Sequence, residues 1–65
     1  MIEYYKMPAK FREGGFILSK EDNRYETGWS YYNLEKNGWM ELNTRYYGFN
    51  KKKKITKEEA FIEML

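Results

Sequence analysis

The stretch Thr27–Phe49 constrains the fold of this 65-residue chain more than any other part of its sequence. Aromatic residues, which are typical of β-strands together with β-branched ones, recur along it. Near its middle, Lys36-Asn37-Gly38 interrupts the strand formers with a turn signal, since glycine adopts positive φ without a Cβ clash. The stretch therefore predicts two antiparallel strands joined by a tight turn.

Two registers of this hairpin are compatible with the turn signal, and the pairing of apolar side chains distinguishes them. With a two-residue loop at 37–38, Leu34 would face the charged Glu41. With a three-residue loop at 36–38, Leu34 would face Met40, so that apolar residues pair with apolar residues. A one-residue slip moves every side chain of a strand to the other face of the sheet. We therefore expect the three-residue loop, with its glycine in a bulge.

This register divides the hairpin residues between two faces. The face expected to join the core carries Tyr32, Leu34, Met40, Leu42 and Tyr46. The opposite face carries Trp29, Tyr31, Asn33, Trp39, Glu41, Asn43, Arg45 and Tyr47. Trp29 would then lie opposite Arg45, close enough for a cation–π contact. So dense an aromatic set indicates that another part of the chain, or a partner, covers this second face.

The composition indicates how so short a chain holds a core. Cys and His are both absent, which excludes disulfides and a Cys/His structural zinc site. The chain has two Trp, seven Tyr and four Phe residues, and burial of each such side chain removes roughly 150–250 Å² from water. We therefore expect residues 1–65 to form one ordered domain with an aromatic core.

The N-terminal region predicts a second hairpin. Ile2–Phe11 is rich in strand formers, although Pro8 cannot donate a ladder hydrogen bond and so indicates an edge strand or a break. A turn signal at 12–15 leads to a short strand at Phe16–Lys20. The register expected for this hairpin pairs Phe11 with Phe16 and Ala9 with Leu18.

The C-terminal residues predict a short helix. Thr56 and Glu59 match a capping box, in which the Thr56 hydroxyl accepts from the Glu59 N–H and the Glu59 carboxylate reaches back. An apolar stripe at helical spacing follows, made of Ala60, Phe61, Met64 and Leu65. So short a helix is unstable alone, so we expect the stripe to pack on the sheet. The expected fold class is α+β, a small antiparallel β-sheet of three to four strands with one C-terminal α-helix.

The net charge of +2 arises in the last fifteen residues, because acidic and basic side chains cancel within residues 1–50. The source is a lysine run made of Lys51, Lys52, Lys53 and Lys54. One interpretation is a solvated connector that keeps its ammonium groups in water. The other is a contact with phosphate groups, which positions a nucleic acid without reading its sequence.

The residue types disfavour catalysis. Without His or Cys, the chain lacks the commonest general base and the most nucleophilic side chain. Ser19 and Ser30 have no base evident in the sequence, and no glycine-rich loop resembles a phosphate cradle. We therefore expect a protein that is not an enzyme and that uses neither a cofactor nor a metal.

The segments YYGF (46–49) and TKEEAF (56–61) follow the central hairpin in that order. This order, over roughly Gly28–Phe61, resembles the end of the AP2-like, arm-type DNA-binding domains of phage integrases. The resemblance implies a three-stranded sheet packed on a C-terminal helix, with the open sheet face laid into DNA. It would place Trp29, Tyr31, Trp39, Arg45 and Tyr47 on the DNA-facing side and the lysine run near phosphates. The chain departs from the family pattern at the extra residues 50–55, and at Glu41 and Asn43, where basic residues are expected.

These features give three hypotheses for function. The first is a nucleic-acid-binding module that uses Trp29, Tyr31, Trp39, Arg45, Tyr47, Lys51, Lys52, Lys53 and Lys54. The second is a small protein-binding inhibitor or modulator, with the general look of a phage accessory protein, that uses the same face or the Ile2–Met7 edge strand. The third is a homodimer with a self-complementary face or edge. No apolar run is long enough to span a membrane, so we expect an intracellular, cytoplasmic protein without a membrane partner.

Overall fold

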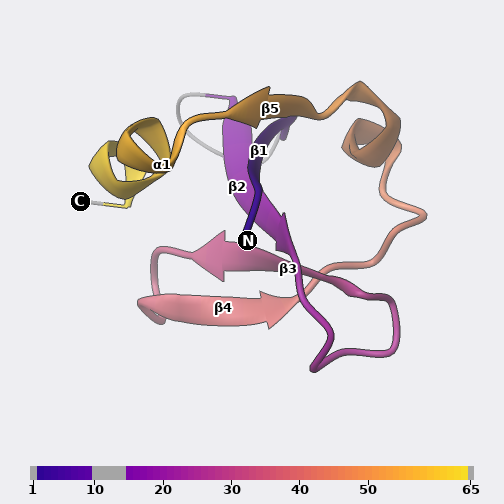
Figure 1. The fold of residues 1–65 in the computed structure, drawn as a ribbon. Coiled ribbons are helices and arrows are strands. Elements are labelled where there is room, and N and C mark those ends of the chain that lie inside the picture. Colours follow the sequence, from indigo (N-terminus) through magenta and orange to yellow (C-terminus); the bar gives the residue numbers. More distant parts are fainter. Residues whose placement is uncertain (1, 10–14, 65) are drawn as a thin grey trace.

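The computed structural model describes residues 2–9 and 15–64 of the chain. Their elements, in chain order, are β1 (Tyr4–Pro8), β2 (Phe16–Glu21), β3 (Trp29–Asn33), β4 (Gly38–Glu41), the 3₁₀ helix η1 (Tyr47–Lys51), β5 (Lys53–Ile55) and α1 (Lys57–Glu63). The strands form one antiparallel sheet of order β4-β3-β2-β1-β5 (Figure 1). The fold is therefore α+β, a small antiparallel sheet with one C-terminal helix, as the sequence predicts.

The expected number of three to four strands is too low, because the described residues form a five-stranded sheet. The additional strand, β5, is made partly from the lysine run that one interpretation treated as a connector. It pairs with β1, so that Tyr4 lies opposite Ile55 and Lys6 lies opposite Lys53. This pairing satisfies backbone groups along a side of β1 that would otherwise be an exposed sheet edge. β1 is consequently an inner strand, and the break expected near Pro8 is its end.

The register of β3 and β4 differs from both registers considered for this hairpin. The opposed pairs are Ser30 with Glu41, Tyr31 with Met40, Tyr32 with Trp39, and Asn33 with Gly38. The loop therefore comprises residues 34–37, and Asn37 takes the left-handed conformation with a φ of 51°. The expected pairing of Leu34 with Met40 is wrong, since Leu34 lies in the loop and is 43% exposed. The register that forms instead brings the rings of Tyr32 and Trp39 into edge-to-face contact across the strands, which stabilises the pair.

The register expected for the first hairpin is also wrong. Met7 lies opposite Ile17, and Phe16 lies opposite Pro8. Beyond this ladder the Ala9 N–H donates to the Gly15 carbonyl at 2.9 Å, so Ala9 does not face β2 at Leu18. Phe11, the other residue of the expected pairing, lies outside the described residues.

One face of the sheet is covered by the segment that contains η1, and we call it the η1 face. Its core comprises Met7, Ala9, Ile17 and Leu42, with Trp29, Tyr31, Tyr46 and Phe49 half-buried against them. The Tyr46 hydroxyl donates to the carbonyl of Pro8 and so fastens the covering segment to the end of β1. Gly48 is buried next to the same carbonyl.

The opposite face is covered in part by α1, and we call it the α1 face. Its core comprises Tyr4, Leu18 and Ala60, with Tyr32, Trp39, Ile55 and Met64 packed against them. The helix begins as the sequence predicts, because the Thr56 hydroxyl accepts from the Glu59 N–H at 3.1 Å. The Glu59 carboxylate does not complete the capping box, and instead accepts from Lys6 of β1 at 3.3 Å. Glu63 lies 3.7 Å from the same ammonium group, so two carboxylates hold α1 to the sheet.

The apolar stripe expected on α1 is only partly buried. Ala60 is fully buried, and Met64 packs against the α1-face core. Phe61, in contrast, is 47% exposed, and Ile62 beside it is 67% exposed. Leu65 lies outside the described residues.

Candidate functional site

The two tryptophans lie on opposite faces of the sheet, so the single aromatic face expected from the sequence is wrong. Trp29 lies opposite Glu21 and packs on the η1 face. Trp39 lies opposite Tyr32 and packs on the α1 face. The cause is the β3–β4 register, which exchanges the two faces of β4 relative to the expected pairing. For the same reason the expected core face is divided, because Tyr32 lies on the α1 face and Leu42 lies on the η1 face.

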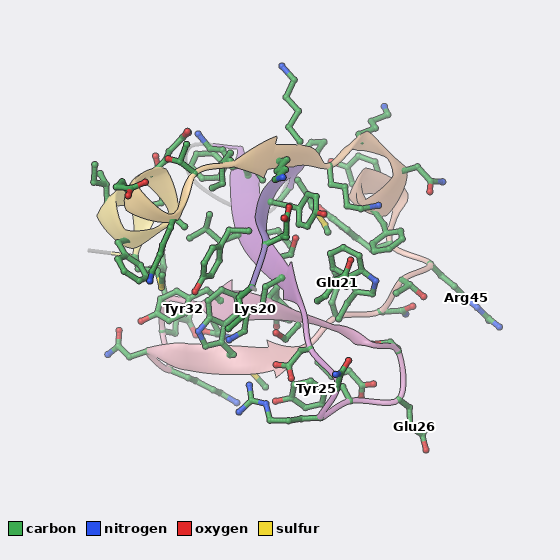
Figure 2. The ribbon with its side chains drawn as sticks, in the orientation of Figure 1. Lys20, Glu21, Tyr25, Glu26, Tyr32 and Arg45 are labelled. Carbon is green, nitrogen blue, oxygen red and sulfur yellow. The ribbon has the colours of Figure 1, made fainter. Side chains whose placement is uncertain are left out.

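Arg45 does not lie opposite Trp29, as the expected register required. The Leu42 N–H donates to the Trp29 carbonyl at 3.0 Å, which makes Leu42 the partner of Trp29. Arg45 lies in the loop that leads into η1, where its own N–H donates to the Asn43 side chain at 2.9 Å. Its guanidinium points away from the sheet into solvent (Figure 2). The cation over the Trp29 ring is Lys52 instead.

Lys52 is the centre of a basic and aromatic cluster on the η1 face. Its Nζ lies 3.9 Å from the centroid of the Phe49 ring and 5.1 Å from that of Trp29. The same ammonium group donates to the Phe49 carbonyl at 3.3 Å. The Trp29 ring meets Phe49 edge-on, with centroids 5.0 Å apart, and meets Tyr5 with centroids 5.3 Å apart. These contacts fix the indole and the ammonium group relative to each other before any ligand binds.

Tyr47 and Lys51 extend this cluster along η1. Tyr47 is 44% exposed, and the Nζ of Lys51 lies 6.0 Å from its ring centroid. The Tyr47 ring also packs on Tyr46, with centroids 4.9 Å apart. Burial raises the pKa of the Tyr46 hydroxyl, the group that donates to the Pro8 carbonyl. We use the name η1 patch for Trp29, Tyr47, Phe49, Lys51 and Lys52, together with Arg45 in the adjoining loop.

The lysine run does not form one continuous surface, because side chains alternate between the faces of a strand. Lys52 points to the η1 face, whereas Lys53 lies opposite Lys6 on the α1 side of the ladder. Lys54 forms an ion pair with Glu3 at 2.7 Å. The hydrogen bond with this carboxylate raises the pKa of Lys54. Tyr31, another predicted contact residue, is half-buried in the η1-face core and is held there by packing.

A second aromatic row lies on the α1 face, and only Trp39 of this row was predicted to bind. Its ring contacts Tyr32 and Tyr4, with centroids 5.4 and 6.1 Å away, and Tyr4 contacts Phe61 at 6.2 Å. The Nζ of Lys20 lies 4.3 Å from the Trp39 ring centroid. Tyr32 and Lys20 lie together in front of the β3–β4 hairpin (Figure 2). Strand alternation would have placed these residues together if the hairpin register had been predicted correctly.

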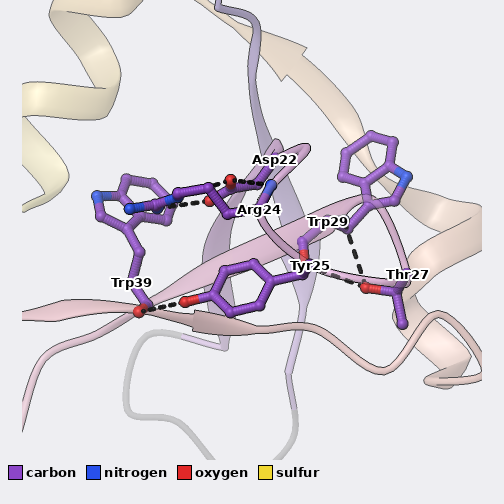
Figure 3. A network of polar contacts seen from close by, with 6 residues as sticks. All are labelled: Asp22, Arg24, Tyr25, Thr27, Trp29 and Trp39. Carbon is purple, nitrogen blue, oxygen red and sulfur yellow. Dashed lines mark hydrogen bonds and ion pairs between the residues drawn. The ribbon is translucent and has the colours of Figure 1, made fainter.

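The loop between β2 and β3 is fixed to the β4 strand beside this row (Figure 3). The guanidinium of Arg24 donates to both carboxylate oxygens of Asp22, at 2.9 and 2.6 Å. These hydrogen bonds from Arg24 hold the pKa of Asp22 well below its usual range. The Tyr25 hydroxyl donates to the Trp39 carbonyl at 3.3 Å. This polar loop is therefore an ordered structure that positions Trp39.

Comparison with known proteins found no matching family model, no matching curated protein and no matching solved structure. The resemblance to arm-type DNA-binding domains therefore stays a prediction. In the described part of the chain, no helix has the length and apolar character needed to cross a bilayer. Within residues 2–9 and 15–64, no three acidic side chains gather as the ligands of a metal ion would. The two clusters of aromatic and basic side chains are thus the features from which function is argued.

Proposed function

We propose that this protein is a non-enzymatic nucleic-acid-binding module that holds a single strand at the η1 patch. The observation that carries the proposal is the position of the Lys52 ammonium group over the rings of Phe49 and Trp29. Proteins that bind single strands place aromatic rings, on which bases stack, beside cations that follow the phosphates. The η1 patch brings both kinds of group together within one short segment of the chain.

The charges around the patch favour an anionic ligand on one side of it. Lys51, Lys52 and Arg45 supply positive charge there. Glu21 is exposed opposite Trp29 on β2, where it would repel a phosphate. The expected path of the phosphates therefore runs over η1, with the bases directed toward the Trp29 ring.

A single strand suits this patch better than a duplex. Stacking on Tyr47, which is 44% exposed, requires a base whose face is free. A duplex keeps its base faces inside the stack, whereas the bases of a single strand can be splayed onto aromatic side chains. With five residues, η1 is also too short to fill a groove as a recognition helix does.

The test is the salt dependence of binding to a fluorescent oligo(dT) of about 16 nucleotides, the upper site size of a single-strand binding fold. If Lys51, Lys52 and Arg45 each neutralise one phosphate, the slope of log K against log salt should be about −2, at about −0.7 per contact. Lys51→Gln should make the slope less steep by about 0.7. Lys36→Gln, which removes the same charge from the exposed 34–37 loop, is the matched control. A slope near zero, or equal effects of the two variants, would contradict the proposal.

A second candidate function, a small protein-binding modulator, is favoured by the outer side of α1. Phe61 and Ile62 are adjacent and are 47% and 67% exposed. Exposed apolar side chains of this kind mark protein interfaces. For this function, Phe61→Ala should lower the affinity for a partner that remains bound after nuclease treatment, while Lys51→Gln should leave that affinity unchanged.

A further inference from the structure

A pocket of about 600 Å³ lies at the end of the sheet where β2 meets the β2–β3 loop. Trp39 and Lys20 line it from the strands, Asn23 and Arg24 line it from the loop, and Ile2 lines it from the N-terminal end of β1. No residue of the η1 patch lines this pocket, although Glu21 of its lining lies opposite Trp29 on β2. Its volume is within the range of small-molecule sites in proteins.

The lining of this pocket carries three acidic and two basic side chains, and two of the carboxylates are held in ion pairs. Asp22 is held by Arg24, and Glu3 is held by Lys54. The remaining charged side chains of the lining are Lys20 and Glu21, which have opposite signs. An anion gains little in such a place, so a phosphate is not the group that fits. A neutral ring with polar edges fits better, because it can stack on the indole and hydrogen-bond to the polar lining.

The aromatic surface of the pocket is Trp39, supported by neighbouring rings. Tyr32 and Tyr4 contact the indole at centroid distances of 5.4 and 6.1 Å. Lys20 rests over the ring at 4.3 Å, and its flexible stem allows it to move aside and leave the ring to a ligand. Base stacking on an aromatic side chain is stronger than such a partly exposed cation–π contact and so offsets its loss.

The wall of the pocket is fixed in advance of binding. The bidentate Asp22–Arg24 pair shapes the loop, and the Tyr25 hydroxyl donates to the carbonyl of Trp39, the residue whose indole lines the pocket (Figure 3). A site that is already ordered loses less entropy when a ligand binds. The loop therefore fixes the position of the Trp39 indole relative to the polar lining of the pocket.

We infer that this pocket is a second binding subsite, which takes one nucleobase of the strand held at the η1 patch. The inference rests on the proposed function for its ligand class. The two subsites differ in chemistry: the η1 patch contacts phosphates and bases, whereas the pocket takes a base alone. A strand that reaches both must pass around the sheet, so only a long oligonucleotide engages the two tryptophans together.

The experiment uses the fact that the chain has two tryptophans, one in each subsite. Trp29→Phe leaves Trp39 as the only indole, and Trp39→Phe leaves Trp29, so each variant reports one subsite by its fluorescence. Both variants are titrated with oligo(dT) of about 4 and about 16 nucleotides, the range of single-strand site sizes. Thymidine monophosphate and acetyl-phenylalanine amide are titrated as the free-nucleotide and protein-side-chain probes. Far-UV circular dichroism checks that each variant is folded.

The expected result is a saturable loss of fluorescence from each indole with the longer oligo(dT), and a much weaker response of Trp39 to thymidine monophosphate. A response of Trp29 without one of Trp39 overturns the inference and leaves the proposed function intact. A response of Trp39 without one of Trp29 overturns the proposed function and the inference with it, because no strand is then held at the η1 patch. If Trp39 responds to acetyl-phenylalanine amide and not to oligo(dT), the pocket belongs to a protein partner and the inference is wrong. Absence of any response overturns both proposals.

If a variant does not fold, the indole N–H signals of the unsubstituted protein give the same readings by NMR.

Discussion

The two tryptophans have similar immediate neighbours and very different surroundings. Each indole has a lysine ammonium group over its ring, Lys52 for Trp29 and Lys20 for Trp39. Around Trp29 three cations of η1 and its adjoining loop outnumber the exposed carboxylate of Glu21 opposite, whereas the lining around Trp39 has three acidic and two basic side chains. The comparison shows that an aromatic ring with a lysine is not by itself a nucleic-acid site. The surrounding charge decides whether phosphate, base or neither is favoured.

Different segments pack over the two faces of the sheet, η1 over one and α1 over the other. The largest effect on stability is expected from a substitution in the segment that contains η1. A Cβ on Gly48 would lie 2.5 Å from the Pro8 carbonyl oxygen and 2.7 Å from a Tyr46 ring carbon. Gly48→Ala should therefore lower the free energy of unfolding by about 1–3 kcal/mol, as overpacking does. Urea denaturation measures this change. Gly38→Ala is the control, because its Cβ would have a nearest contact of 3.7 Å. Equal losses in the two variants would show that η1 is not tightly packed.

Removing the lysine from each tryptophan compares the two subsites directly. Lys52→Met should weaken oligo(dT) binding about tenfold, because a charge-assisted phosphate contact of roughly 1.5 kcal/mol is lost. Lys20→Met should change the affinity by less than about threefold, since the pocket contacts a base and not a phosphate. Fluorescence anisotropy at constant salt measures both. A larger loss for Lys20→Met would reverse the assignment of the two subsites.

The cover of the α1 face depends on its helix cap. Thr56→Ala removes the hydroxyl that accepts from the Glu59 N–H, and should lower the free energy of unfolding by about 1 kcal/mol. Thr56→Ser keeps that oxygen and should lose much less. If the two variants unfold alike in urea, the cap does not stabilise α1. Binding at the η1 patch should be unchanged in both, because that patch lies on the other face.

The smallest expected effect is a dependence on pH that comes from the loop beside Trp39. Arg24 holds the pKa of Asp22 below its unfolded value of about 3.9, so the pair stabilises the folded state above about pH 4. This contribution is lost as the pH falls toward the folded pKa. Asp22→Asn should therefore flatten the fall of Tm between about pH 4 and about pH 2. Glu35→Gln in the exposed hairpin loop is the control, and an identical pH profile for both variants would contradict the role of the pair.

The sequence was sufficient to predict the fold class, the start of the helix and the existence of four strands. Strand formers and the Thr56 cap act locally, so a short stretch of sequence contains their signal. The fifth strand was missed because Lys53–Ile55 pairs with a strand about fifty residues earlier, and local sequence does not record that partner. A three-residue segment also carries little strand signal of its own.

The candidate site was predicted only in part, because side-chain direction depends on register. The loop of the central hairpin was placed at 36–38, whereas residues 34–37 form it. The rejected two-residue loop differs from the observed register by an even number of residues, so each side chain would point to the same face in both. It would therefore have placed Trp29 and Trp39 on opposite faces. The three-residue loop was preferred because it pairs Leu34 with the apolar Met40. Leu34, however, is 43% exposed. The role of Phe49, in contrast, follows only from tertiary packing.

The most direct test of the central claim is an NMR titration of the unsubstituted protein with oligo(dT), following the two indole N–H signals. The Trp29 signal should shift with added strand, and rising salt should reverse the shift, because binding at the η1 patch depends on phosphate contacts. An unchanged Trp29 signal, with the protein folded and the strand in excess at low salt, would contradict the central claim.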